Sequence, residues 1–261
     1  REKLLAEQAG LLGNCLRVHR LTGLSEYARM AEEIVRYLDG KLFDAATGAF
    51  FGCEDFLRYE NDKPAGAGEF FSIIDQCIYS DANALAVSAY LDGAMQLKRD
   101  DCKARALAIL EFIWNRCHSV ETGIYHFYDG APRVAGLLND QAQVGTALVR
   151  AYLATGNEVY LERARVLADF VTTRLRDPAG GYFDLPAEEL GLLKMHLTEI
   201  SQNGAAASFL LALAAAGGEE KYHAAAGWAL DAFPGDFNAY GIHAAPFGRA
   251  LCVYLGTRAM T

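Results

Sequence analysis

The chain has 261 residues, 52% of them hydrophobic, which is enough for one large domain or two small ones with a substantial core. Its formal net charge is −9, and no cluster of Lys and Arg interrupts this acidic balance, so we expect no nucleic-acid partner. No run of eighteen apolar residues lacks a polar interruption, which argues against a membrane partner.

The six cysteines are scattered and show neither a C-x-x-C motif nor a Cys/His spacing suited to a metal. We therefore expect no metal and no cofactor, and a reducing, cytoplasmic location. The N-terminus "REKLLAEQAG" has no apolar signal-peptide core, and it begins with Arg, which suggests that a preceding segment is missing.

In chain order, the sequence predicts two alternating kinds of helix. Residues 27–38, 102–117 and 160–175 each carry one apolar stripe at helical spacing and charges on the opposite side, as in helices with one solvated face. Residues 82–97, 142–154 and 205–216 are apolar almost all round, which predicts helices buried on every side. A last helix is expected over residues 247–255. The alternation indicates an inner and an outer layer.

Glycines reveal a repeat of helical hairpins. A Gly precedes a Tyr by four residues in "TGLSEY", "TGNEVY" and "GGEEKY", where it suits the end of a helix. A second set, Gly48, Gly123 and Gly181, follows at a common offset of 21 residues from Tyr27, Cys102 and Tyr160. These glycines begin aromatic segments that read as turns or short β-hairpins.

Polar residues recur at the heads of the buried helices. The four pairs are Glu7 with Gln8, Asp81 with Asn83, Asp140 with Gln141, and Gln202 with Asn203. The links from an amphipathic helix to the next buried helix are long, whereas the links within a hairpin are short, so the long links gather at one end. We therefore predict an all-α fold, an incomplete (α/α)6-type toroid with short β-hairpins on its long-loop face.

The whole of residues 1–261 is expected to form this single domain, with about four hairpins and a closing helix. A closed ring of six hairpins needs roughly half as much chain again. The helix at residues 4–20 is thus expected to expose an apolar edge, unless another chain or the missing N-terminal segment covers it.

In order, the segments "EKLLAEQAGLL", "GAFFGCED", "YSDANALAVSAYL", "GLLNDQAQVGTALVRAYLATGN", "GGYFD" and "SQNGAAASFLLAL" resemble the toroid region of YyaL-like proteins, the relatives of spermatogenesis-associated protein 20. That resemblance implies a six-hairpin, glycosidase-like toroid that normally follows a thioredoxin-like domain. We do not expect that upstream domain within residues 1–261. The resemblance implies a fold more firmly than a reaction.

Asp81 and Asp140 are the candidate catalytic residues, because two carboxylates in one cleft can share the acid and base roles of glycoside hydrolysis. The alternative is structural: Asp and Asn at helix heads commonly cap the first turn or bond between helices. The candidate ligand-binding residues are Asn83, Gln141, Glu199, Gln202, Asn203, His126, Tyr128 and His196. Aromatic residues of the long loops can stack on sugar rings or pack against the core.

Two functions remain open. The first is a carbohydrate-related toroid that binds or processes a sugar-like ligand at the heads of the inner helices. If it is an enzyme, it is expected to resemble a glycosidase or a sugar epimerase, and an epimerase of this fold would use histidines for proton transfer. The second is a non-catalytic toroid that serves as a binding or scaffold module in a thioredoxin-like multidomain protein.

Overall fold

A computed structural model describes residues 2–59, 69–186, 195–233, 235 and 237–258. These residues form two compact units. Unit 1 contains residues 1–112 and 127–131, and unit 2 contains residues 113–126 and 132–261. Each unit is described by itself, and the prediction of one domain over the whole chain stays a prediction.

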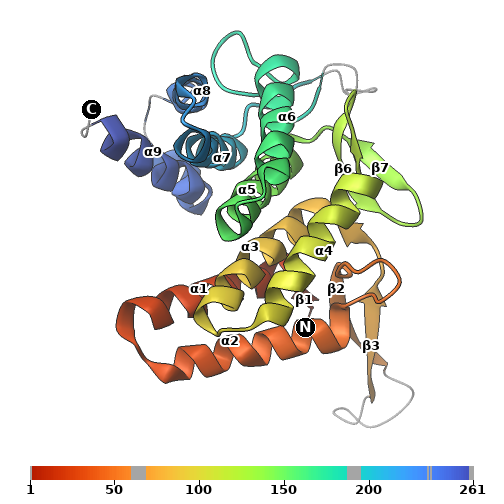
Figure 1. Cartoon of the computed structure of the whole chain (residues 1–261). Coiled ribbons are helices and arrows are strands. Elements are labelled where there is room, and N and C mark those ends of the chain that lie inside the picture. The colour runs from red at the N-terminus through yellow and green to blue at the C-terminus, as the bar shows by residue number, and fades with distance from the viewer. Residues whose placement is uncertain (1, 60–68, 187–194, 234, 236, 259–261) are drawn as a thin grey trace. The chain divides into compact units, whose positions relative to one another are not determined.

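Unit 1 is built on two helical hairpins and a small sheet (Figure 1). Helix α1 (Leu5–Thr22) packs against α2 (Ser25–Tyr37) and against α3 (Ser80–Gln96), which is followed by α4 (Asp100–Arg116). Helix α2 continues into a π-helical turn at Leu38–Leu42. The antiparallel sheet has the order β1 (Lys3–Leu4), β2 (Cys53–Tyr59) and β3 (Glu69–Asp75). A short strand, β4 (Ile78–Tyr79), leads into α3 and pairs with residues 127–128.

Unit 2 contains two further hairpins and the closing helix (Figure 1). Helix α5 (Leu138–Thr155) packs against α6 (Glu158–Arg174) and α7 (Ile200–Gly217), and α7 also contacts α8 (Glu220–Asp231) and α9 (Ala245–Arg258). A 3-10 segment, Phe237–Ala244, precedes α9. Strand β5 (His118–Ser119) pairs with the start of β6 (Gly123–Tyr128), which is followed by β7 (Pro132–Ala135). The four predicted hairpins and the final helix are thus present.

The apolar character of α7 is explained by its neighbours. It is the one described helix whose length and composition would also allow it to cross a membrane, and half of it is buried. Its contacts with α5, α8 and α9 cover its apolar side chains, as expected for an inner helix of a two-layered helical protein.

The glycines of the repeat take the conformation for which they were singled out. Gly23, Gly156 and Gly218 end α1, α5 and α7 with φ angles of 71°, 70° and 69°, in the left-handed region. The corresponding position after α3 is Lys98, and it is also left-handed, with a φ of 56°. A left-handed residue therefore occurs at this position in all four hairpins, although one of them lacks the glycine.

The second glycine set has a common conformation as well. Gly48, Gly123 and Gly181 have φ angles of 78°, 74° and 78°. Each lies in a short antiparallel hairpin, which pairs Phe43 with Phe50, His118 with Ile124, and Arg176 with Tyr182. The predicted β-hairpins are confirmed at these three places, but the longer β2–β3 hairpin was not foreseen.

The outward face of α1 is mixed in character. Leu11 and Leu21 are 45% and 74% exposed, as the predicted apolar edge requires. Glu7, Asn14 and Arg17 are exposed as well. The edge is therefore less apolar than predicted, and its cover by a further segment or chain stays a prediction.

Candidate functional site

The N-cap residues of the inner helices do not use their own side chains as caps. The N-cap residues of α1, α3, α5 and α7 are Leu4, Tyr79, Leu137 and Glu199, and none makes a side-chain capping hydrogen bond. Asp81 lies two residues after the N-cap of α3 and Asp140 three residues after the N-cap of α5, both inside the first turn. Neither aspartate is therefore the N-cap residue itself, and the structural alternative for them, which includes hydrogen bonds to the first turn, stays a prediction.

A repeated amide clamp occupies the fourth residue of three inner helices. Asn83 accepts a hydrogen bond from the Phe50 N–H at 2.9 Å, and its amide NH₂ donates to the carbonyl oxygens of Phe50 and Tyr79, each at 2.9 Å. Gln141 makes the same three bonds, accepting from the Ile124 N–H at 3.0 Å and donating to the carbonyls of Ile124 and Leu137.

Asn203 completes the set. It accepts from the Tyr182 N–H at 2.8 Å and donates to the carbonyls of Tyr182 and Glu199. All three clamp residues are fully buried. Each amide therefore satisfies one residue of the preceding glycine hairpin and the N-cap carbonyl of its own helix, which a buried backbone needs.

The hydrogen bonds of the clamp leave three candidate ligand-binding residues without a free amide N–H group. Asn83, Gln141 and Asn203 were predicted to bind a ligand, but both N–H groups of each amide already bond to the backbone. A buried amide with this bonding holds the fold together, and its removal leaves backbone groups without partners. These three residues are not carried into the functional proposal.

The residue just before the clamp differs from helix to helix. In α5 it is Asp140, which is fully buried and lies opposite His126. The Nδ1 atom of His126 is 3.2 Å from each carboxylate oxygen of Asp140. The His126 side chain is 30% exposed, so the imidazole connects a buried carboxylate to the surface.

The clamp also explains how His126 and Asp140 meet. Gln141 fixes Ile124 of β6, and Asp140 is the neighbour of Gln141 in the chain. His126 lies two residues beyond Ile124, on the same side of the strand. Sequence reasoning named both residues, but it assigned His126 no partner, because the register between strand and helix is not visible in the spacing.

Asp81, the other candidate catalytic residue, lies in unit 1, whereas Asp140 lies in unit 2. Asp81 is the second residue of α3 and is half-buried. One of its carboxylate oxygens accepts from the Ala82 N–H at 2.7 Å. The pairing of Asp81 with Asp140 in one cleft stays a prediction.

The head of α7 carries a different polar group. Gln202 donates to the exposed carboxylate of Glu199 at 2.8 Å. His196, upstream in the same loop, stacks on Phe183 with ring centroids 4.2 Å apart. Its Nδ1 atom is buried without a hydrogen-bond partner among the described residues. These three candidates are available to a ligand in a way that the clamp amides are not.

Tyr128, the remaining candidate, lines a cavity of about 550 Å³ in unit 1, here called the Tyr128 cavity. Its volume falls in the range of small-molecule sites. It lies among the first glycine hairpin, the β3–β4 link and the β6–β7 turn, and it is lined by Asp44, Thr47, Phe51, Asp75, Gln76, Cys77, Ile78, Tyr128, Asp129 and Gly130. No Lys or Arg is among these residues, so the walls are acidic and aromatic.

Sequence reasoning missed Asp44, Asp75 and Asp129. They fall in three separate links, and no local pattern joins them. Two of them hold the loops: Asp44 accepts from the Ala46 N–H and the Thr47 hydroxyl, and Asp75 accepts from the Cys77 N–H. Burial raises the pKa of the Cys77 thiol, with the Asp75 charge acting in the same direction, so this thiol is a poor nucleophile at neutral pH.

His126 supplies an imidazole nitrogen and Asp140 supplies carboxylate oxygens, and both kinds of atom commonly ligate transition metals. The pair is also suited to proton transfer, in which the carboxylate orients the imidazole and stabilises its charged form.

No family model matches the chain, and no curated protein matches it. Solved structures do. A D-mannose isomerase matches with a TM-score of 0.69 and 16% identity over 88% of this chain and 59% of its own. Cellobiose 2-epimerase from Bacillus thermoamylovorans matches with a TM-score of 0.72 and 12% identity over 88% and 60%.

A family 76 glycoside hydrolase (mannosidase) from Bacteroides thetaiotaomicron matches with a TM-score of 0.72 and 15% identity over 97% of this chain and 71% of its own. At these identities the likeness concerns the fold. This chain spans about three fifths of the length of the isomerase and the epimerase. The predicted fold class, an all-α protein of the α/α-toroid type, is confirmed.

Proposed function

We propose that this protein is a carbohydrate-related toroid that binds a sugar-like ligand and moves a proton on it through His126 and Asp140. The observation that carries the proposal is the buried Asp140 carboxylate, with both oxygens 3.2 Å from Nδ1 of a partly exposed imidazole. Fold-level analogy supports the ligand class, because the similar structures are named as sugar isomerases, sugar epimerases and mannosidases.

The geometry favours proton transfer over hydrolysis. With Nδ1–H donating to Asp140, the neutral imidazole places its basic lone pair on Nε2, on the far side of the ring. Such a base can take a proton from a carbon next to a sugar carbonyl, and the resulting imidazolium is stabilised by the carboxylate. Hydrolysis would instead need a second acid at a defined separation, and Asp81 is the candidate for that role.

The Tyr128 cavity supports a ligand rich in hydroxyl groups. Carboxylate oxygens of Asp75 and Asp129 accept hydrogen bonds from hydroxyls, while the rings of Phe51 and Tyr128 offer apolar faces for a pyranose. An anionic sugar would be repelled by walls that hold three aspartates and no cation. We therefore infer that this cavity of unit 1 suits a neutral or amino-substituted sugar rather than an anionic one.

The test is solvent exchange at carbon. The protein is incubated in D₂O with mannose, glucose, fructose and cellobiose, and deuterium incorporation next to the carbonyl is followed by proton NMR. His126→Ala and Asp140→Asn are each expected to slow exchange by about 10²–10⁴-fold. His19→Asn is the matched control, since this histidine lies in the last turn of α1 and bonds to the Leu24 carbonyl.

Exchange that survives both substitutions in the folded protein would contradict the role of the pair. Hydrolysis of a mannoside without exchange would shift the assignment to Asp81 and Asp140 as a two-carboxylate site. Neither exchange nor sugar binding would favour the second candidate, a non-catalytic scaffold module. The observation in favour of that candidate is the clamp, which uses three of the head residues for structure alone.

Two finer assignments belong to the proposal as well. We propose that the chain is the toroid region of a YyaL-like protein that works beside a thioredoxin-like domain, on the strength of the ordered segments quoted above. A cytoplasmic location goes with it. Identification of the full-length coding sequence, together with fractionation of cells that express it, tests both.

A further inference from the structure

A second cavity lies in unit 2, between α6 and α8, and is here called the Tyr222 cavity. It has a volume of about 400 Å³. Its polar lining comes from Asp169, Thr172 and Arg176 on the side of α6 and from Lys221, Tyr222 and Trp228 on α8. It differs from the Tyr128 cavity in charge, because it contains two cations and one carboxylate in an otherwise acidic protein.

Tyr222 is the unusual residue of this cavity. Its side chain is only 1% exposed, yet its hydroxyl has no hydrogen-bond partner among the residues that the structure describes. The Lys221 ammonium lies 4.6 Å from the centre of the ring. Burial raises the pKa of Tyr222, so the hydroxyl stays protonated at neutral pH and is a donor. Buried hydroxyls without partners are uncommon in folded proteins.

Arg176 is held in place without a carboxylate. Its guanidinium lies 3.9 Å from the centre of the Trp228 ring, and the indole N–H is itself fixed by the Gly181 carbonyl at 3.1 Å. Within the described part of the chain, Arg176 makes no ion pair. Stacking on an indole orients a guanidinium while leaving its N–H donors for an anion.

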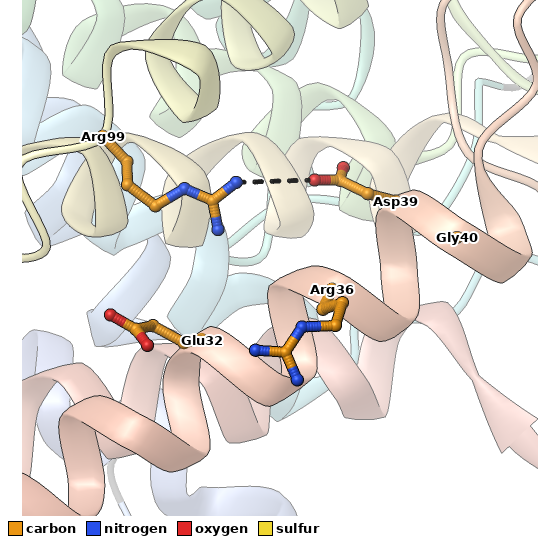
Figure 2. A pocket seen from close by; sticks show the side chains of 5 residues that line it. All are labelled: Glu32, Arg36, Asp39, Gly40 and Arg99. Carbon is orange, nitrogen blue, oxygen red and sulfur yellow. Dashed lines mark ion pairs between the residues drawn. The ribbon is translucent and has the colours of Figure 1, made fainter.

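A cavity in unit 1 also contains arginines, but there a carboxylate of the protein itself pairs with an arginine (Figure 2). This Asp39 cavity has a volume of about 380 Å³. Here Asp39 accepts from the buried Tyr90 hydroxyl at 3.0 Å and pairs with Arg105 at 2.9 Å and with Arg99 at 3.9 Å. One internal carboxylate therefore serves a buried tyrosine and two arginines.

The Tyr222 cavity has a buried tyrosine and an arginine but lacks the equivalent of Asp39. Its own carboxylate, Asp169, lies 3.7 Å from Lys221, whose side chain is 58% exposed and also pairs with Glu219 at 3.4 Å. Such an exposed pair is weak and easily exchanged. We propose that the Tyr222 cavity is a binding site for an oxyanion, the phosphate or carboxylate group of a small molecule, which takes the place that Asp39 holds in unit 1.

This inference is independent of the proposed sugar chemistry, because it concerns other residues on other helices. The bound group would accept from the Arg176 guanidinium, the Lys221 ammonium and the Tyr222 hydroxyl, which are charge-assisted or buried donors. Thr172 already donates its hydroxyl to the Ala168 carbonyl, so it contributes shape rather than charge.

The experiment is a titration by isothermal calorimetry and thermal shift at constant ionic strength. Inorganic phosphate and acetate are the probes, and sodium chloride is the reference. The expected result is saturable binding of at least one oxyanion. Phosphate alone would assign a phosphate group, and binding of both would assign a general oxyanion site. An effect no larger than that of chloride would overturn the proposal.

The variants locate the site. Tyr222→Phe removes only a hydroxyl without a partner, so it should fold as well as the parent while weakening binding about fivefold. Arg176→Gln should weaken binding about tenfold or more. Arg99→Gln, in the Asp39 cavity, is the matched control and should leave the affinity unchanged. Affinity that is retained in both Tyr222→Phe and Arg176→Gln, or lost in Arg99→Gln, would overturn the assignment.

Discussion

The heads of α3 and α5 use the same fourth residue for the same task and differ in the residue just before it. In α3, Asn83 clamps Phe50, and the preceding residue is Ala82. In α5, Gln141 clamps Ile124, and the preceding residue is Asp140, which faces His126. What repeats along the chain maintains the fold. What occurs once, a buried carboxylate against a histidine, is where chemistry should be sought.

The largest effect should come from breaking the shared part of this comparison. Asn83→Ala and Asn203→Ala each remove three buried hydrogen bonds, two of which hold a backbone N–H and a carbonyl of the preceding hairpin. The free energy of unfolding should fall by about 3 kcal/mol or more in urea titrations. Gln202→Ala, which removes a bond to an exposed carboxylate, should change it by less than about 0.5 kcal/mol. Equal losses of unfolding free energy in the clamp variants and in Gln202→Ala would contradict the structural role assigned to the clamp.

A second test uses the fifth residue of the inner helices. It is Ala84 in α3 and Ala142 in α5, but Gly204 in α7. A Cβ atom on Gly204 would lie 2.3 Å from the backbone nitrogen of Phe247, so α9 would have to move. Gly204→Ala should therefore lower the free energy of unfolding by about 1–3 kcal/mol.

Helix propensity alone predicts the opposite sign for Gly204→Ala, a gain of about 1 kcal/mol. The direction of the change therefore decides whether the close approach of α9 matters. Ala142→Gly in α5 is the control, with an expected loss of about 1 kcal/mol from propensity.

A smaller effect is expected where one hairpin departs from the other three. Lys98 adopts a φ of 56° where α1, α5 and α7 are followed by glycine. Lys98→Gly should raise the free energy of unfolding by about 0.5–1 kcal/mol, because the left-handed backbone strains a side chain. Gly156→Ala should lower it by about 1 kcal/mol. Thermal denaturation of the two variants measures both, and a loss of stability in Lys98→Gly would contradict the equivalence of the four turns.

The smallest effect concerns Glu54 in unit 1, which is the buried acid other than Asp140 among the described residues. Burial acts to raise the pKa of Glu54, but hydrogen bonds from the hydroxyls of Ser72 and Tyr37, with the Lys41 charge, outweigh it and hold the pKa below its usual value. A lowered pKa means stability that is present above the ordinary glutamate pKa and is lost as the pH falls through the folded value.

Glu54→Gln should therefore flatten the acid side of the profile of stability against pH, as followed by urea unfolding between neutral and acidic pH. The parent should lose stability over that range more steeply than the variant. A parallel pair of profiles would mean that the Glu54 carboxylate has no favourable partner in the folded state.

Much of the fold could be predicted from the sequence because the helical hairpins repeat at a regular spacing. The spacing of Gly23, Gly156 and Gly218 marks the helix ends, and the second glycine set marks the hairpins. The left-handed conformation of Lys98 could not be predicted in this way, because the residue at that position is not a glycine. The β2–β3 hairpin could not be predicted either, since it occurs in one link only and has no counterpart in the repeat.

The candidate site was predicted less well. The amides at the helix heads were expected to cap the helices or to bind a ligand. They bond instead to hairpins 17 to 33 residues earlier in the chain. A signal was present, since an amide stands four residues into each helix that follows a glycine hairpin. The partnership of His126 with Asp140 and the walls of the Tyr128 and Tyr222 cavities depend on three-dimensional register, which periodicity does not specify.

The clamp has a consequence for how the chain is made. Each glycine hairpin bonds to an amide of the next inner helix, so a hairpin that has just left the ribosome lacks these bonds until that helix is synthesised. The Phe50 N–H lacks its partner until Asn83 is made, and the Tyr182 N–H lacks its partner until Asn203 is made. A newly made repeat is thus stabilised only when its successor arrives, and a pause in translation just before α3 or α7 would hold exposed hairpin backbone open to chaperones or to misfolding.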